Sequence, residues 1–205
     1  MRLRTAGYPV TDPFGLFDQV QLVTNASTLA KGDCLLLWGG KDISPHYYGE
    51  KPNRHVHTSE SDVQDRDEWA MIQQATRLDI PIIGVCRGLQ WLTIAGGGKL
   101  MQHGDGHGIS HKMIVKETGE QMYVNSAHHQ LCLVADPGVV LATDPTPVKC
   151  IDGNNKPVTL PFVVEAAYFP QIRGFGVQYH PEWSSCPDRA VAWAAEQIKK
   201  YLLEK

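Results

Sequence analysis

Short apolar runs alternate with longer amphipathic stretches along much of this chain. The runs 34–38 (CLLLW) and 80–86 (IPIIGVC) contain no charged residue. Such runs are typical of strands that are buried on both faces of a parallel sheet. A further strand is predicted at 175–180 (FGVQYH). The pattern therefore places at least three strands in the interior of the protein.

The stretches that follow these strands have the spacing of helices. Residues 66–79 have acidic residues near their start, and residues 88–97 end in glycine, as helices commonly do. A third, amphipathic helix is predicted at 188–205. The apolar positions that recur at helical spacing are Trp69, Ile72 and Ala75 in the first helix and Val191, Ala194, Ala195, Ile198 and Leu202 in the last.

Alternating strands and helices indicate an α/β fold with a mostly parallel central sheet flanked by helices. Residues 110–170 are richer in β-branched residues and turns, which predicts a small antiparallel region. The chain has no internal repeat, low-complexity tract or linker-like segment. We therefore expect a single domain over residues 1–205.

Composition and charge exclude several classes of function. Hydrophobic residues make up 42% and charged residues 20%, and the formal net charge is -3. Without basic runs, neither nucleic acid nor an anionic membrane surface is an expected partner. No apolar segment reaches the roughly 18 residues that span a bilayer, and the first 13 residues lack the apolar core of a secretory signal.

Five cysteines are present, at positions 34, 86, 132, 150 and 186, with no CxxC pair. An odd number without paired spacing argues against a disulfide framework and against a structural zinc site. The expectation is a cytoplasmic protein with free thiols.

Cys86 has a sequence context that the other cysteines lack. It lies between a predicted strand and a predicted helix, in the pattern Gly84-x-Cys86-x-Gly88. This is the cysteine counterpart of the nucleophile elbow, in which flanking glycines let strand and helix pack closely. The helix N-terminus favours a thiolate, although a small buried thiol in a packed core would also fit the motif.

A thiol nucleophile needs a base, and His180 is the strongest candidate among nine histidines. It ends a predicted strand and is followed by Pro181 and Glu182. Residues two apart on an extended chain project to the same side, so Glu182 can orient the His180 imidazole. Backbone N–H groups of Arg87 and of Gly39 or Gly40, at the end of the neighbouring strand, could form an oxyanion hole.

Longer segments then match a known family. They are 35–50 (LLLWGGKDISPHYYGE), 66–75 (RDEWAMIQQA), 80–100 (IPIIGVCRGLQWLTIAGGGKL), 124–130 (VNSAHHQ) and 174–183 (GFGVQYHPEW). These segments occur in the same order as in the family, and the chain resembles a class I glutamine amidotransferase-like domain. It is most similar to the gamma-glutamyl-gamma-aminobutyrate hydrolase group of gamma-glutamyl hydrolases, which the element from Asp42 to Glu50 favours.

The resemblance implies a flavodoxin-like three-layer sandwich that hydrolyses a γ-glutamyl amide through a glutamyl thioester. It implies a triad of Cys86, His180 and Glu182 and an oxyanion hole formed by the backbones of Gly40 and Arg87. The implied substrate-binding residues are Gln90, Ser126, His128 and His129. The implied substrate is a small molecule, glutamine or a γ-glutamyl amine, and the chemistry requires neither a metal ion nor an organic cofactor.

Several alternatives stay open at this point. The chain could be a glutaminase subunit that passes ammonia to a separate synthetase, a non-catalytic member of the fold, or a homodimer. The short stretch before residue 124 leaves the amine half of the substrate undefined. The loop ligands His103, Asp105, His107 and His111 could bind a metal, but three interspersed glycines favour a plain glycine-rich loop.

Overall fold

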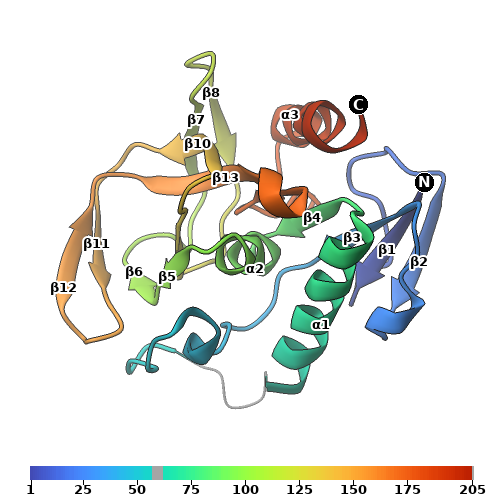
Figure 1. Ribbon diagram of the computed structural model, residues 1–205. Helices are drawn as coiled ribbons and strands as arrows, with labels where there is room; N and C mark the ends of the chain where they lie inside the picture. The colour runs from blue at the N-terminus through green and yellow to red at the C-terminus, as the bar shows by residue number, and fades with distance from the viewer. Residues whose placement is uncertain (57–61, 205) are drawn as a thin grey trace.

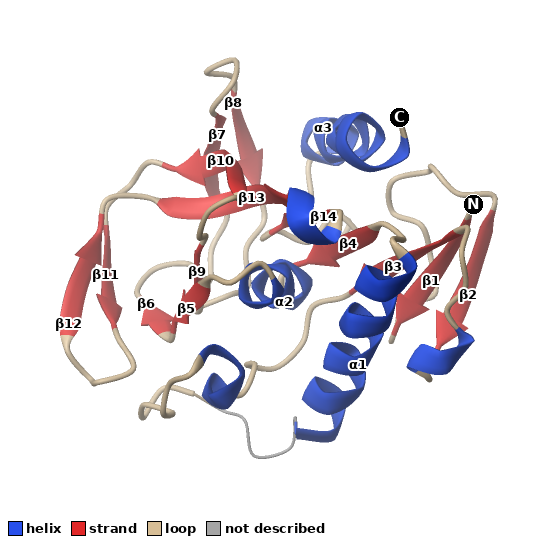
Figure 2. Cartoon of the chain, viewed as in Figure 1, coloured by secondary structure: helices blue, strands red, loops and turns tan. Residues whose placement is uncertain are grey.

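A nine-stranded sheet forms the centre of the computed structural model, which describes residues 1–56 and 62–204 (Figures 1 and 2). The strand order is β2-β1-β3-β4-β14-β13-β10-β7-β8. Neighbouring strands from β2 to β14 pair in parallel, and those from β14 to β8 pair antiparallel. The parallel strands are Arg2–Ala6 (β1), Gln19–Val23 (β2), Asp33–Leu37 (β3), Ile82–Val85 (β4) and Gly174–Val177 (β14).

The antiparallel half is larger than the sequence suggested. Its strands are His111–Val115 (β7), Gln121–Val124 (β8), Val139–Asp144 (β10) and Val163–Phe169 (β13). Two smaller sheets lie beside it, one of Lys99–Met101 (β5) and Leu131–Leu133 (β9), the other of His103–Gly104 (β6), Val148–Ile151 (β11) and Pro157–Leu160 (β12). The predicted α/β fold is confirmed, but its central sheet is mixed.

Helices cover both faces of the parallel half. Helices α1 (Asp62–Leu78) and α2 (Arg87–Ala95) pack on one face, and α3 (Asp188–Ile198) packs on the other (Figure 2). Successive residues of β3 show this division, because Leu35 packs in the core with α1 and α2 while Leu36 packs in the core with α3. Both faces of β3 are therefore buried, as a run of apolar residues predicts.

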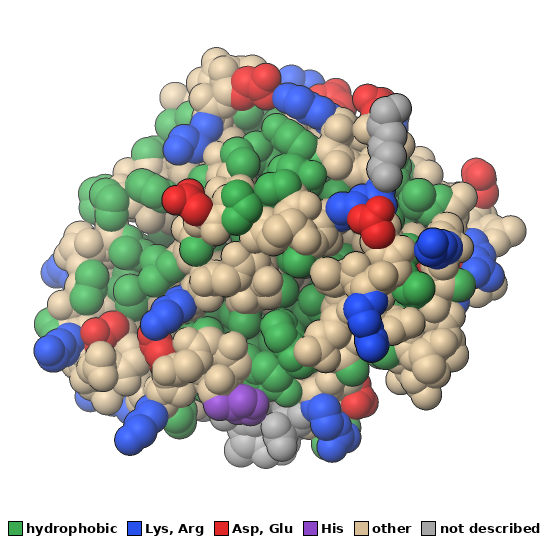
Figure 3. Space-filling model, viewed as in Figure 1, with side chains coloured by type: hydrophobic (Ala, Val, Ile, Leu, Met, Phe, Trp, Pro, Cys, Tyr) green, Lys and Arg blue, Asp and Glu red, His purple; other side chains and the backbone are tan. Residues whose placement is uncertain are grey.

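Short turns complete the chain. They are the 3₁₀ turns η1 (Ala26–Thr28), η2 (Pro45–Tyr48) and η3 (Pro170–Ile172), and a π-helical turn η4 (Lys199–Leu203) that continues α3. No helix in the described part of the chain is long and apolar enough to cross a membrane. On the face shown in Figure 3, basic and acidic side chains are interspersed rather than gathered into one patch.

Two glycines let β4 turn directly into α2. A Cβ on Gly84 would lie 2.4 Å from the carbonyl carbon of Gly88, and a Cβ on Gly88 would lie 2.4 Å from the carbonyl oxygen of Leu37. Both are backbone atoms, one in α2 and one at the end of β3, so they cannot move aside as a flexible side chain can. The close approach of α2 to β3 and β4 therefore depends on the missing side chains.

We predict that Gly88→Ala destabilises the protein strongly, because the added methyl group would overlap the Leu37 carbonyl. Overpacking of this kind costs about 1–3 kcal/mol or more. The measurement is the denaturant midpoint of each purified variant. Gly108→Ala is the matched control, because a Cβ there meets nothing within 4 Å; equal midpoints for the two variants would contradict the packing argument.

Candidate active site

Cys86 occupies the turn between β4 and α2 with a backbone conformation that non-glycine residues rarely adopt. Its φ is 51° and its ψ is -104°. The Cys86 N–H donates to the Val177 carbonyl at 2.8 Å, and the Gln90 N–H donates to the Cys86 carbonyl at 3.2 Å. Such a conformation costs about 1–3 kcal/mol and persists where the surroundings fix it. The elbow expected from the sequence is present.

His180 and Glu182 lie beside this thiol, just beyond β14. The Cys86 side chain is close enough to the His180 ring to raise its pKa, and His180 Nδ1 lies 2.8 Å from Glu182 Oε1. The three residues of the expected triad are thus connected, with His180 between the thiol and the carboxylate. Cys86 and His180 are almost fully buried, so a substrate must reach a recessed thiol.

The surroundings of His180 favour its protonated form. Burial alone would lower the pKa of this imidazole, but the contacts with Cys86 and Glu182 outweigh that effect and raise the pKa to about 9. At neutral pH His180 is therefore a cation beside the thiol. This is the form that can donate a proton to a leaving amine.

Two further residues hold His180 in place, and the sequence analysis did not assign either of them. Asn125 accepts from the His180 N–H at 2.8 Å and donates to the His180 carbonyl at 2.9 Å. Trp183 stacks on the imidazole, with ring centroids 3.9 Å apart and planes 8° from parallel. The only sequence signal for them was their membership of the family-like segments 124–130 and 174–183.

The two glycines after β3 lie against different partners. A Cβ on Gly39 would lie 2.7 Å from His180 Cε1 and 3.6 Å from Cys86 Cβ, whereas a Cβ on Gly40 would lie 3.0 Å from Arg87 Cδ. Gly39 thus borders the thiol and imidazole, and Gly40 borders the Arg87 side chain. An oxyanion hole from the backbone of Gly40 and Arg87 stays a prediction.

The Arg87 side chain turns into the protein rather than toward the thiol. It is 1% exposed and forms ion pairs with Asp65 and Glu68 of α1. Trp91 Nε1 also donates to Glu68, at 2.6 Å, and the Ser44 N–H donates to Asp65 at 2.9 Å. This charged network joins the elbow helix to α1 and to the loop that follows Gly40.

The four predicted substrate-binding residues occupy different surroundings. Gln90 is buried, with Nε2 3.5 Å from the Gln130 carbonyl. The Ser126 hydroxyl donates to the His107 carbonyl. His128 is buried, and burial lowers its pKa to about 3, so its ring is neutral at physiological pH. Their role in substrate binding stays a prediction.

His129 points to another partner than His128, as expected for adjacent residues. Its Nε2 lies 2.9 Å from Asp42 Oδ1, and its side chain is one-third exposed. Gln102 holds the end of the same family-like loop, since its amide donates to Glu50 at 3.0 Å and to the Lys51 carbonyl at 2.9 Å. Residues 42–51 are therefore fastened to the segments around 102 and 129.

The glycine-rich loop separates into two groups of potential ligands. His103 lies 3.2 Å from His129 and 3.3 Å from Asp105, with its ring stacked on His55. His107 and His111 instead lie near Glu165 of β13, and one ligand atom from each of these three lies within 4.8 Å of the others. The four loop ligands that the sequence brought together do not form one site.

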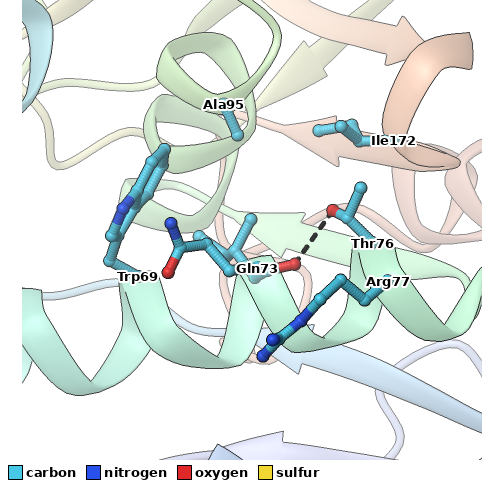
Figure 4. A pocket seen from close by; sticks show the side chains of 7 residues that line it. Trp69, Gln73, Thr76, Arg77, Ala95 and Ile172 are labelled. Carbon is cyan, nitrogen blue, oxygen red and sulfur yellow. Dashed lines mark hydrogen bonds between the residues drawn. The ribbon is translucent and has the colours of Figure 1, made fainter.

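A separate surface cavity lies between α1 and the end of α2 (Figure 4). Its volume is about 430 Å³, and Thr76 at its floor donates to the Ile72 carbonyl at 2.9 Å. Its lining is Trp69, Ile72, Gln73, Thr76, Arg77, Ala95 and Ile172. None of the three residues of the triad lines it, so it is distinct from the candidate active site.

Comparison with known proteins now gives the family. The family model described as Peptidase C26 matches residues 5–142. This chain belongs to the Peptidase C26 family. YvdE of Lactococcus lactis, named as a glutamine amidotransferase-like protein, is 30% identical over 207 residues, covering 91% of this chain and 77% of YvdE.

A second sequence relative and a solved structure are also similar to this chain. The gamma-glutamyl-gamma-aminobutyrate hydrolase PuuD of Escherichia coli is 28% identical over 213 residues, covering 89% of this chain and 76% of PuuD. The crystal structure of a glutamine amidotransferase from Thermotoga maritima superimposes with a TM-score of 0.54 at 12% identity, covering 97% of this chain and 91% of that chain. The latter supports the fold.

We predict that the His180 imidazole titrates with a pKa of about 9 and that Cys86→Ala lowers this value. The folded pKa exceeds the unfolded value of about 6.5. The charge therefore stabilises the folded protein fully below about pH 6.5, and this contribution is lost as the pH rises through 9. The measurement is the ring chemical shift of His180 by NMR. An unchanged pKa in Cys86→Ala would contradict the contact between the two side chains.

Proposed function

We propose that this protein hydrolyses a γ-glutamyl amide bond, in glutamine or a γ-glutamyl amine, through a glutamyl thioester on Cys86. The main support is the arrangement of Cys86, His180 and Glu182. A cysteine with a φ of 51° lies at a helix N-terminus beside an imidazole whose pKa it raises and whose Nδ1 is held by a carboxylate. A packing cysteine has no need of these features.

In the first half of the reaction, Cys86 attacks the γ-carbonyl carbon of the substrate as a thiolate, its proton being the one that His180 carries. The carbonyl electrons move onto oxygen, and the backbone N–H groups of Arg87 and the Gly39-Gly40 turn would stabilise that charge. Collapse of this intermediate breaks the C–N bond. The proton carried by His180 passes to the departing nitrogen, so ammonia or an amine leaves and a thioester remains.

In the second half, water attacks the thioester carbonyl. His180, now neutral, accepts a proton from the water, and the thiolate departs from the carbon. The products are glutamate and the regenerated enzyme with a protonated His180. Glu182 stabilises the imidazolium in both halves, because its Oε1 stays on Nδ1.

The names of the relatives support cleavage of a γ-glutamyl amide bond but do not identify the leaving amine. PuuD is named as a hydrolase of gamma-glutamyl-gamma-aminobutyrate, and YvdE is named as glutamine amidotransferase-like. Both descriptions are compatible with a γ-glutamyl amide. The segment 42–51, in which Asp42 pairs with His129, is the expected place for selection of the leaving amine.

We predict that the purified protein cleaves at least one member of a panel of γ-glutamyl amides, glutamine included, without a partner protein. Cys86→Ala should lower kcat by on the order of 10³-fold or more, because the nucleophile is lost. Cys150→Ala is the matched control, since Cys150 belongs to the small sheet of β6, β11 and β12 and should leave turnover near that of the unmodified protein.

The measurements are product glutamate and released amine. Glutaminase activity that arises only when a synthetase partner is added would instead support a glutaminase subunit. Turnover that is unchanged in Cys86→Ala would overturn the proposed mechanism.

A further inference from the structure

Three histidines and one glutamate converge in the interior beside the antiparallel half of the sheet. This His–Glu cluster consists of His107, His111, His128 and Glu165. His107 lies in the turn after β6, His111 begins β7, His128 lies in the loop between β8 and β9, and Glu165 belongs to β13. The His107 ring centroid lies 5.2 Å from that of His111 and 5.3 Å from that of His128.

Two of the histidines hold their rings in the same way. His111 Nδ1 lies 3.1 Å from the Ile109 carbonyl, and His128 Nδ1 lies 3.1 Å from the Gln130 carbonyl. A carbonyl can only accept, so in each ring Nδ1 carries the hydrogen. Nε2 of each ring is buried without a hydrogen-bond partner. Metal-binding histidines are commonly oriented in this way, with one nitrogen donating to a carbonyl and the other free to bind.

The other two members also have polar atoms without partners. His107 Nδ1 and both carboxylate oxygens of Glu165 are buried and lack a hydrogen bond. Glu165 Oε1 lies 3.0 Å from His111 Nε2, and the two side chains form an ion pair. Glu165 itself is 0% exposed. Burying polar atoms without full compensation is costly. The ion pair leaves Glu165 Oε2, His107 Nδ1 and His128 Nε2 without a partner, and these three atoms require an explanation.

We propose that the His–Glu cluster binds one divalent transition-metal ion, with zinc as the best-matched ion. Three imidazole nitrogens and one carboxylate oxygen form a donor set that zinc accepts in a four-coordinate site. Magnesium and calcium prefer oxygen ligands, so this set discriminates against both. Ligand atoms of His107, His111 and Glu165 already lie within 4.8 Å of one another. The ring of His128, which would supply the fourth ligand, lies 5.3 Å from that of His107 and 6.4 Å from that of His111.

This ion would link the cluster to the candidate active site without touching substrate. The segment from Asn125 to His128 connects the two places: Ser126 donates to the His107 carbonyl, and Asn125 holds the backbone of His180 from both sides. A bound ion would fix His107 and His128 and thereby the segment between them. We therefore assign the ion a structural role. In this assignment His128 binds the metal ion.

The proposal revises the expectation that this protein needs no metal. In the sequence, His107 and His111 are close to His103 and Asp105. In the folded protein they lie beside His128 and Glu165 instead. His103 instead contacts His129 and Asp105. His103 therefore offers a matched control, a histidine of the same loop that lies outside the proposed site.

The test measures metal directly. The full chain is stripped with a chelator, dialysed against zinc and then against metal-free buffer, and its zinc content is determined by inductively coupled plasma mass spectrometry. We expect about one zinc per chain, and the same for His103→Ala. His107→Ala and the isosteric Glu165→Gln should each retain less than a tenth of this amount.

Cobalt(II) supplies a second readout that is independent of activity. Unmodified protein and His103→Ala loaded with cobalt should show the intense visible absorption of a four-coordinate site, and His107→Ala should lack it. Circular dichroism establishes that each variant is folded, and the unmodified protein decides the question if a variant is not. Absence of bound zinc in the folded unmodified protein, or equal binding by His107→Ala and Glu165→Gln, would overturn the proposal and leave His111 and Glu165 as a buried ion pair.

Discussion

The backbone of Cys86 is the constraint on which the candidate site depends. Its φ of 51° turns β4 into α2 within one residue, and only the absence of side chains at Gly84 and Gly88 lets the turn close against the backbone around Leu37. The same close packing lifts the thiol to the carboxyl edge of the parallel strands, where ligands bind in open α/β sheets. His180 reaches that edge because β14 pairs with β4 in parallel.

A buried network of ion pairs stabilises the position of the elbow. Arg87 follows Cys86 directly, and its ion pairs with Asp65 and Glu68 join α2 to α1. Removing one partner of a buried pair leaves an uncompensated charge, which is strongly destabilising. The family-like segment around residues 66–75 therefore has a structural role, because Glu68 accepts hydrogen bonds from both Arg87 and Trp91. The elbow is held by charge on one side and by close backbone packing on the other.

Local patterns were enough to predict β3, β4, α1, α2 and α3, because burial on both faces of a strand leaves an apolar run and burial on one face of a helix leaves a helical period in the sequence. The Gly–Cys–Gly pattern likewise predicted the elbow. The extent of the antiparallel half and the His–Glu cluster were not predictable in this way. Glu165 lies 37 residues beyond His128 in the sequence, and only the pairing of β13 with its neighbours brings them together.

Trapping of the acyl-enzyme tests the central claim most directly, since the account rests on Cys86 as the atom that attacks. Protein mixed with a γ-glutamyl amide is quenched in acid, digested and analysed by mass spectrometry. The account predicts a glutamyl adduct on the peptide that contains Cys86, and loss of that adduct in Cys86→Ala. An adduct on a peptide that contains another of the five cysteines would contradict it.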